Sequence, residues 1–332
     1  MQHPFETYVH VPGLIAIKTN LPGFRWGFGE CSSPSTEAEY DSCRLKVFLE
    51  ARNDREVFAE TDLRSYTGIF RDYKAIPQRK AVVFEKRIGP VALRFLVSVD
   101  GNHVRAVVGK SYLRLIKLKL MYIHPIAYVL FDLVSLMLLE QGMTTLYGAA
   151  ALLRENKTVL CAAAPNTGKS LTVLQLQNKY GGRILAEDMA VTDGERLWGA
   201  PYTGLYRNYH DESLREAGKK QETTLPAHRV DGVFLLQKGA LDWELELEPE
   251  VFLHQLLLIN HYSLGYYYSP CLRVLDYYNR DLDVQAAQEV EARILGRLVG
   301  KARRMMVERR NSREFAPAIH ASMVDEMPQG VN

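Results

Sequence analysis

The stretch Ala163-Ala-Pro-Asn-Thr-Gly-Lys169-Ser170 decides the expected fold of this chain of 332 residues. Residues 158–163, which lead into it, form a short apolar run typical of a buried parallel strand. Residues 171–180, which follow it, space their leucines as a helix does. A tight turn between a strand and a helix is a setting in which backbone N–H groups point at phosphate oxygens. The sequence therefore predicts a phosphate-binding loop on an α/β core.

The loop supplies the residues that we expect around the phosphates. The Lys169 ammonium would reach the outer phosphates, and the Ser170 hydroxyl would hold Mg²⁺. The pattern opens with Ala163 where glycine is usual, which removes some backbone freedom without forbidding the loop. The alternative is a plain strand–turn–helix with a surface lysine. The residues expected to bind the nucleotide are Ala164, Pro165, Asn166, Thr167, Gly168, Lys169, Ser170 and Leu171.

Two adjacent carboxylates, Glu187 and Asp188, follow the next predicted strand, residues 183–186. Ligands of open α/β sheets bind at the carboxyl ends of the strands, so we expect this pair beside the loop. Adjacent strand residues point to opposite faces, and the two carboxylates can therefore have different roles. One can ligate Mg²⁺ while the other accepts a hydroxyl proton. The alternative is that the acidic pair only caps the following turn.

Composition and charge limit the range of partners. A net charge of +2 gives no strong signal for nucleic acid or membrane, and 24% charged residues argue against disorder. The four cysteines contain no Cys-x-x-Cys pair, which fits a reducing cytoplasm and gives no metal site built from cysteines. We expect no signal peptide, because polar residues occupy the N-terminal region. The apolar segment 125–139 carries Asp132 and is shorter than the ~20 residues that span a bilayer, so it is expected to be a buried helix.

The chain is expected to contain two domains, 1–120 and 121–332. The first is predicted to be β-rich, and its Asp100-Gly101 turn predicts a hairpin. The second is predicted to hold the loop, with strands near 189–199 and 230–237. Its helices are expected over 249–262 and 282–310, after a mostly helical lead-in over 111–142. The short strands expected in the first domain cover residues 5–9, 14–18, 45–50, 81–85, 91–99 and 104–108.

Residues 146–205 resemble the kinase domain of the HPr kinase/phosphorylase family and its HPr-kinase-related relatives. The resemblance implies a P-loop kinase core of HPr-kinase type behind a β-rich N-terminal domain, with ATP and Mg²⁺ as cofactors. The matching motifs are Leu146-Tyr147-Gly148, Gly168-Lys169-Ser170, Gly181-Gly182, Ala186-Glu187-Asp188 and Pro201-Tyr-Thr-Gly204-Leu205. The family has Leu-His-Gly in place of the first of these motifs and Ala-Asp-Asp in place of the fourth.

Roles carried over by position make Glu187 the base toward a serine hydroxyl and Asp188, with Ser170, the metal ligand. Lys169 completes the catalytic set. Two positions depart from the family: Tyr147 replaces a histidine that assists proton handling, and Glu187 replaces an aspartate. A tyrosine is protonated at neutral pH and is a poor base. The family's reverse reaction, phosphate-driven dephosphorylation, is therefore not expected here.

The sequence thus predicts an ATP-dependent kinase that phosphorylates a Ser or Thr hydroxyl of a peptide or small protein. A β-rich domain before such a core is similar to HPr-kinase-related proteins that modify ribosomal peptides such as lasso-peptide precursors. One alternative is a kinase for a small molecule such as free serine or a sugar. Another is a nucleotide-binding regulatory protein without turnover. The acceptor, the choice among ATP, GTP and pyrophosphate, and the formation of a homo-oligomer are left open.

Further basic residues are candidates for binding roles. An arginine near the Pro201-to-Leu205 segment could offset charge on the transferred phosphoryl group, and Arg207 and Arg229 are the two candidates to test. The alternative is that each is a surface residue. The run 293–310 alternates basic and apolar residues and predicts an amphipathic basic helix. Such a helix would pack its apolar face on the core or bind an acidic leader peptide, a partner subunit or RNA.

Overall fold

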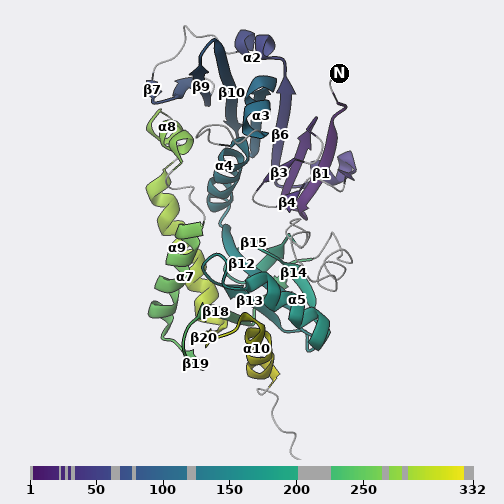
Figure 1. The fold of residues 1–332 in the computed structure, drawn as a ribbon, viewed down its shortest axis with the longest axis vertical. Helices are drawn as coiled ribbons and strands as arrows, with labels where there is room; N and C mark the ends of the chain where they lie inside the picture. The colour runs from purple at the N-terminus through teal and green to yellow at the C-terminus, as the bar shows by residue number, and fades with distance from the viewer. Residues whose placement is uncertain are drawn as a thin grey trace, which may run out of the picture. The chain divides into compact units, whose positions relative to one another are not determined.

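The computed structural model of the chain describes residues 3–21, 24–26, 29–30, 34–60, 68–76, 80–117, 125–200, 226–263, 269–278 and 283–324. Contacts between Cα atoms divide the chain into two compact units. The first consists of Met1–Gln141 and Gly265–Gln288, and the second of Gly142–Leu264 and Glu289–Asn332. Both are mixed α/β, and each contains a nine-stranded sheet (Figure 1). This division places residues 126–140 in the first unit, whereas the sequence-based division starts the second domain at residue 121.

The first unit contains the predicted strands and hairpin. Its elements are β1 (Glu6–Val11), β2 (Ile15–Thr19), β3 (Arg25–Trp26), β4 (Gly29–Glu30), β5 (Pro34–Ser35), α1 (Glu37–Ser42), β6 (Leu45–Arg52), α2 (Asp54–Glu60), β7 (Gly68–Phe70), β8 (Tyr73–Ile76), β9 (Ala81–Ile88), β10 (Val91–Asp100), β11 (His103–Gly109), α3 (Lys110–Lys117), α4 (Ile126–Glu140) and α8 (Pro270–Tyr278). The strand order is β5-β1-β2-β6-β11-β10-β9-β8-β7. β6 is parallel to β2 and β11, and the other neighbours are antiparallel.

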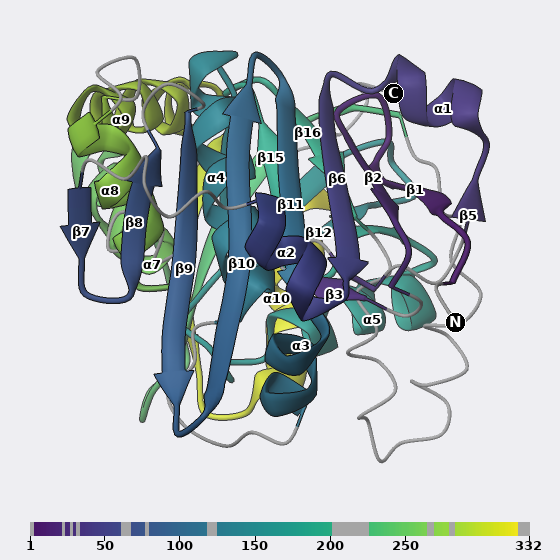
Figure 2. The same cartoon turned by 90° about the horizontal axis from the view of Figure 1, so that it is seen from above.

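The core of this sheet is aromatic on one face. Phe84 and Phe95 stack with ring centroids 4.9 Å apart, and Tyr73 and Tyr112 meet them edge to face. α4 and α8 lie on this face, and α2 covers part of the other, where Phe58 packs under the Arg94 guanidinium (Figure 2). α4 is buried almost along its whole length, as the sequence predicts.

The second unit contains the predicted loop. Its elements are β12 (Thr144–Leu152), β13 (Thr158–Ala162), α5 (Lys169–Tyr180), β14 (Arg183–Ala186), β15 (Met189–Thr192), β16 (Arg196–Gly199), β17 (His228–Arg229), β18 (Gly232–Lys238), β19 (Trp243–Glu246), α7 (Pro249–Ser263), α9 (Val284–Lys301, from residue 289), β20 (Arg303–Arg309), the 3₁₀ turn η5 (Ser312–Glu314) and α10 (Phe315–Val324). The strand order is β17-β16-β15-β12-β13-β18-β20-β19, and β14 pairs with β12.

Helices cover both faces of this second sheet. α5 and α10 bury Val173, Leu174 and Ile319 against one face (Figure 1). α7 and α9 bury Phe252 and Leu298 against the other. β13 is therefore fully buried, which explains why its sequence is a continuous apolar run rather than an alternating one. The helix that follows, α5, ends at Gly181 in the left-handed conformation, as the Gly181-Gly182 pair predicts.

Three neighbouring strands of this sheet, β13, β18 and β20, are parallel. Their carboxyl ends meet at one edge, which is where the predicted loop follows Ala162. Their amino ends meet at the opposite edge, next to Lys157, Asp231 and Arg303. β14 is antiparallel to β12, which is antiparallel to β13, so β14 also ends at the edge of the loop. The loop therefore lies at the edge formed by the carboxyl ends of these strands. The opposite edge, at their amino ends, is about 16 Å away, which is the length of the five residues of β13.

The predicted helix over 282–310 is wrong in its last third. α9 ends at Lys301, and Arg303–Arg309 form the strand β20 between β18 and β19. Met305 and Val307 alternate into the core, so this part has the period of a strand. The spacing of the basic residues around them is also compatible with a helix. The segment forms a strand because it pairs with β18.

Two further predictions concern the rest of the chain. The Pro201-to-Leu205 motif and Arg207 lie outside the described residues. Among the helices of the described ranges, none is both long enough and apolar enough to cross a membrane.

Candidate functional site

The loop between β13 and α5 has a backbone shaped by two residues in unusual conformations. Asn166 has φ +62° and Gly168 has φ +121°. Alternation of such conformations with ordinary ones turns successive N–H groups toward one side, which makes an anion-binding concavity. The Thr167 hydroxyl donates to the Ala164 carbonyl at 2.9 Å and closes the turn. The two positive φ angles show a tight turn, and binding of phosphate by its N–H groups stays a prediction.

Gly168 is required for two independent reasons. Its φ of +121° is disfavoured for residues with a side chain. In addition, a Cβ at this position would lie 2.6 Å from the Ser312 Cβ of η5. The chain thus passes closely against η5 just before α5 begins. The glycine of the Gly-Lys-Ser motif is fixed by packing as well as by the turn.

The Lys169 side chain is 4% exposed, although it carries an ammonium group. Its Nζ donates to the Ala163 carbonyl at 3.1 Å and lies 3.9 Å from the centroid of the Tyr147 ring. Burial lowers the pKa of Lys169 to about 8, and the Asp188 carboxylate opposes part of this fall. A buried lysine folded back over its loop is not the surface lysine of the alternative interpretation.

Asp188 is the carboxylate that the structure brings to Lys169. It is partly exposed and accepts a hydrogen bond from the Tyr147 hydroxyl. Burial raises the pKa of Asp188, whereas Lys169 and the Tyr147 hydroxyl lower it. Burial and the nearby Asp188 charge raise the pKa of Tyr147, so its hydroxyl stays a donor. Tyr147, Lys169 and Asp188 thus form one contact group.

Glu187, the other carboxylate of the pair, is fully buried. Its side chain is 0% exposed, and its backbone carbonyl accepts a hydrogen bond from the Ser170 hydroxyl at 3.4 Å. The two acidic neighbours therefore differ in exposure, but they lie in the bend between β14 and β15, so the alternation expected along a strand does not apply to them. The catalytic role expected for Glu187 stays a prediction, and of the pair only Asp188 is partly exposed beside Lys169.

Lys238 is a cation at the loop that the sequence did not predict. It ends β18, and its Nζ donates to the Asn166 carbonyl at 3.3 Å. β18 is parallel to β13, so its carboxyl end reaches the same edge as the loop. A lysine at the end of the neighbouring parallel strand was the available signal, but the pairing of the two strands was not known from the sequence.

A buried polar network supports Tyr147 from behind. The Asn260 side chain is 1% exposed, accepts from the Tyr147 N–H at 2.8 Å and donates to the Thr145 carbonyl at 3.1 Å. It also donates to Glu291, which is 0% exposed and contacts His261. Satisfied networks of this kind rigidify a core. No local sequence pattern predicts this network, because Asn260 follows its partners in β12 by more than 100 residues.

The residues at the loop fit an Mg²⁺-nucleotide. Lys169, Lys238 and the backbone N–H groups of the loop would hold phosphates, and Ser170 and Asp188 are oxygen ligands of the kind that Mg²⁺ takes. Within the described ranges, no three His, Cys, Asp or Glu residues gather as a metal cage. An ion at this place would therefore complete its shell with phosphate oxygens and water, as Mg²⁺ commonly does.

Arg229, the second candidate arginine, does not lie at the loop. Arg229 lies in β17 and lines a cavity together with Lys157 and Arg303, which stand at the amino ends of the parallel strands. That edge is opposite to the loop. The structure therefore gives no support to a role for Arg229 at the transferred phosphoryl group.

Comparisons with known proteins add little to this geometry. No protein-family model matches the chain, and no curated protein matches it. One similar solved structure is the HPr(Ser) kinase/phosphatase from Coxiella burnetii, with 14% sequence identity and a TM-score of 0.20. The similarity covers 37% of this chain and 97% of that protein's chain. Values this low establish neither a common fold nor a common activity.

Proposed function

We propose that this protein is a Mg²⁺- and ATP-dependent kinase that transfers a phosphoryl group to a hydroxyl, such as the Ser or Thr of a peptide or small protein. The observation that carries the proposal is the buried Lys169, held at the start of α5 beside Asp188 by a loop with two positive φ angles. A buried cation is costly unless an anion compensates it. The Asp188 carboxylate offsets part of this cost, and a nucleotide phosphate would add a second anion.

The proposed roles follow from the contacts. Lys169 and the loop N–H groups bind the phosphates, and Lys238 adds charge at the same edge. Asp188 and Ser170 would hold Mg²⁺, which supplies charge neutralisation of the phosphates when bound. The Tyr147 hydroxyl orients the Asp188 carboxylate, while Asn260 fixes the Tyr147 backbone. Proton removal from the acceptor is assigned to Glu187 by sequence and is the least supported of these roles, because Glu187 is fully buried.

Nucleotide binding is tested by thermal unfolding of the wild type and Lys169→Met with and without Mg²⁺-ATP. A ligand that binds only the folded state at ~100 times its Kd stabilises it by about 2.7 kcal/mol, so we expect a clear rise in Tm for the wild type. Lys169→Met should show no rise, because methionine fills the space without the charge. Lys179→Met, an exposed lysine at the end of the same helix, is the matched control and should behave as wild type.

The same titration identifies the donor. If GTP or pyrophosphate raises the Tm of the wild type while ATP does not, the donor assignment is wrong and the loop assignment stands. If none of the three raises it, or if all raise it equally in wild type and Lys169→Met, the loop does not bind phosphate and the proposed function fails.

ATP affinity should depend on pH through Lys169. The pKa of this group is about 8 in the free protein, and a bound phosphate would raise it. Binding should therefore take up a proton near pH 8, and the affinity should fall as the pH rises above 8. Calorimetry in two buffers of different ionisation enthalpy measures the proton uptake. The same affinity at every pH from about 7 to 9.5 would contradict the assigned contact.

A nucleotide-binding protein without turnover is the second candidate. The observations that favour it are the Tyr147 ring on Lys169, where the related kinases have a histidine, and the buried Glu187. Incubation with Mg²⁺-ATP and a set of acceptors, followed by mass spectrometry, separates the two. A gain of one phosphoryl group on a peptide, a protein or a small molecule such as serine supports the kinase and identifies the acceptor class. ATP binding without any such gain and without ADP formation supports the second candidate.

A further inference from the structure

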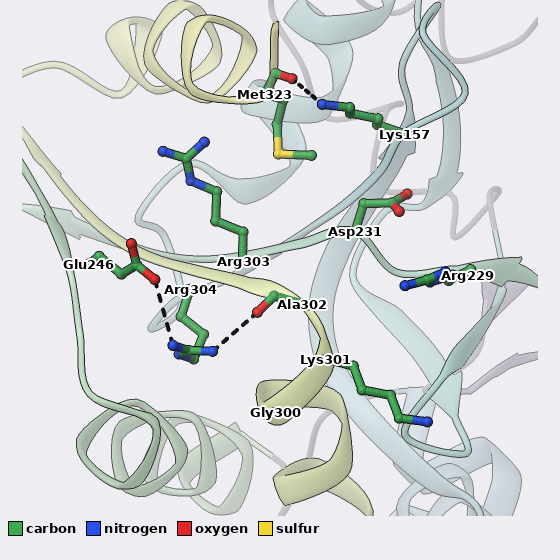
Figure 3. Close-up of a pocket in the computed structure, with 10 residues that line it drawn as sticks. All are labelled: Lys157, Arg229, Asp231, Glu246, Gly300, Lys301, Ala302, Arg303, Arg304 and Met323. Carbon is green, nitrogen blue, oxygen red and sulfur yellow. Dashed lines mark hydrogen bonds and ion pairs between the residues drawn. The ribbon is translucent and has the colours of Figure 1, made fainter. Parts of the chain in front are cut away.

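The second unit contains a cavity that is separate from the loop. Its volume is about 430 Å³, within the range of small-molecule sites. Lys157, Asp231 and Arg303 line it, and these residues stand just before or at the amino ends of β13, β18 and β20. Because the three strands are parallel, this is the edge opposite to the loop. The ten lining residues are Lys157, Arg229, Asp231, Glu246, Gly300, Lys301, Ala302, Arg303, Arg304 and Met323 (Figure 3).

The lining is strongly cationic. Five of the ten residues are lysine or arginine, against two carboxylates. Both carboxylates have partners within the fold: Asp231 accepts from the Thr158 N–H at 2.8 Å, and Glu246 lies 3.6 Å from Arg304. Lys301 pairs with Glu195, which lies outside the cavity. The positive charge of the cavity therefore exceeds the negative charge that its own walls supply.

The fold holds these cations in place. Lys157 donates to the Met323 carbonyl at 2.7 Å, and Arg303 donates to the Ser322 carbonyl. These carbonyls belong to the last turn of α10, where cations are favourable. Figure 3 shows Lys157 against Met323, and Arg304 between Glu246 and the Ala302 carbonyl. Cations that are positioned before a ligand arrives cost less to order on binding.

Among the described residues, Arg229 adds a second observation of concentrated positive charge. It is exposed, and its partner across the β16–β17 pair is Arg196. Like charges placed directly opposite each other on neighbouring strands are destabilising. A multivalent anion in the cavity would offset this repulsion.

We propose that this cavity binds a small anion that carries two or more phosphate groups. Three of the five cations are arginines, whose planar guanidinium groups match the oxygens of a phosphate in pairs. The volume suits a small molecule. The site is independent of the proposed kinase function, because it lies at the other edge of the sheet and shares no residue with the loop.

Calorimetric titration with sodium pyrophosphate, without Mg²⁺ and at low ionic strength, tests the site in four proteins. Lys169→Met removes the cation of the loop and leaves the cavity intact, so it should still bind one equivalent. Adding Arg229→Gln to Lys169→Met should weaken binding about tenfold, as expected for the loss of one hydrogen bond between charged groups. Adding Arg293→Gln instead removes an equal charge from an exposed position of α9 outside the cavity, and binding should not change. The fourth protein is the wild type.

The outcomes are distinct for the two sites. Two equivalents in the wild type and one in Lys169→Met support both the cavity and the loop, and one equivalent in each supports the cavity alone. No binding to Lys169→Met overturns the cavity proposal and leaves the proposed function untouched. Equal weakening by Arg229→Gln and Arg293→Gln also overturns it, because binding would then follow overall charge. Tighter binding of citrate than of pyrophosphate by Lys169→Met overturns the assignment to phosphate.

Discussion

Asp188→Asn is expected to lower kcat for phosphoryl transfer by about 10³-fold, or roughly 4 kcal/mol of transition-state stabilisation. The neutral amide would keep a hydrogen bond with Tyr147 but would ligate Mg²⁺ poorly and would no longer attract Lys169. Single-turnover transfer from ATP to the acceptor found by mass spectrometry measures the loss, and ADP formation serves as a readout without acceptor. Asp193→Asn, in the turn between β15 and β16, is the matched control and should retain full activity.

Measuring the rate of transfer by Glu187→Gln together with that by Asp188→Asn identifies the residue that removes the proton from the acceptor. The sequence predicts that this change abolishes transfer and leaves nucleotide binding largely intact, with a loss of about 10² to 10⁴ for a general base. An inactive Asp188→Asn beside a fully active Glu187→Gln would move proton removal from Glu187 to Asp188 or to water. Full activity of Asp188→Asn, with normal folding, contradicts the proposed site.

The second large effect concerns the stability of the first unit. Asp132 is 5% exposed in α4, and burial raises its pKa to about 7. In the unfolded chain the carboxyl ionises near its ordinary pKa of 3.8, so between pH 4 and 7 the folded state binds more protons. The free energy of unfolding should therefore fall as the pH rises through this window, by about 4 kcal/mol for a shift of three units. Above pH 7 the fall is complete.

Asp132→Asn removes this titration. We expect the variant to be more stable than wild type at pH 8, and to lose that advantage at pH 4, where Asp132 is protonated in the folded state. Urea denaturation at the two pH values, followed by circular dichroism, measures the difference. Asp100→Asn changes an exposed carboxylate in the β10–β11 turn of the same unit and should show no such dependence. An equal effect of Asp132→Asn at both pH values would rule out an ionised buried Asp132.

The sequence predicted the parts of the fold that local patterns determine. The strand, loop and helix around Lys169 lie within one or two residues of their predicted limits, because an apolar run, a Gly-Lys-Ser turn and a Gly181 C-cap are all local signals. The β10–β11 hairpin was predicted for the same reason: Asp100 pairs with His103 around Gly101, whose φ is +54°.

What the sequence missed depends on distant partners. Residues 303–309 form a strand because β18 and β19 lie on either side of them. The residues next to this segment in the sequence give no sign of the pairing. Asn260 and Lys238 reach the site from elements that follow the loop by many residues. The sequence also named both acidic residues after β14, but it could not show that Glu187 is buried while Asp188 is partly exposed beside Lys169.

The order of strands in the second unit has a consequence for synthesis on the ribosome. β13 lies beside β18, and β18 lies beside β20, so the sheet around the loop stays incomplete until residue 309 has emerged. The first unit likewise needs residues 265–288. The first unit is therefore incomplete until residue 288 has emerged, and until residue 309 the nascent chain carries unpaired strand edges, which favour aggregation. A premature stop before residue 303 would remove β20 and leave one edge of β18 without its partner, rather than give a shortened but folded protein.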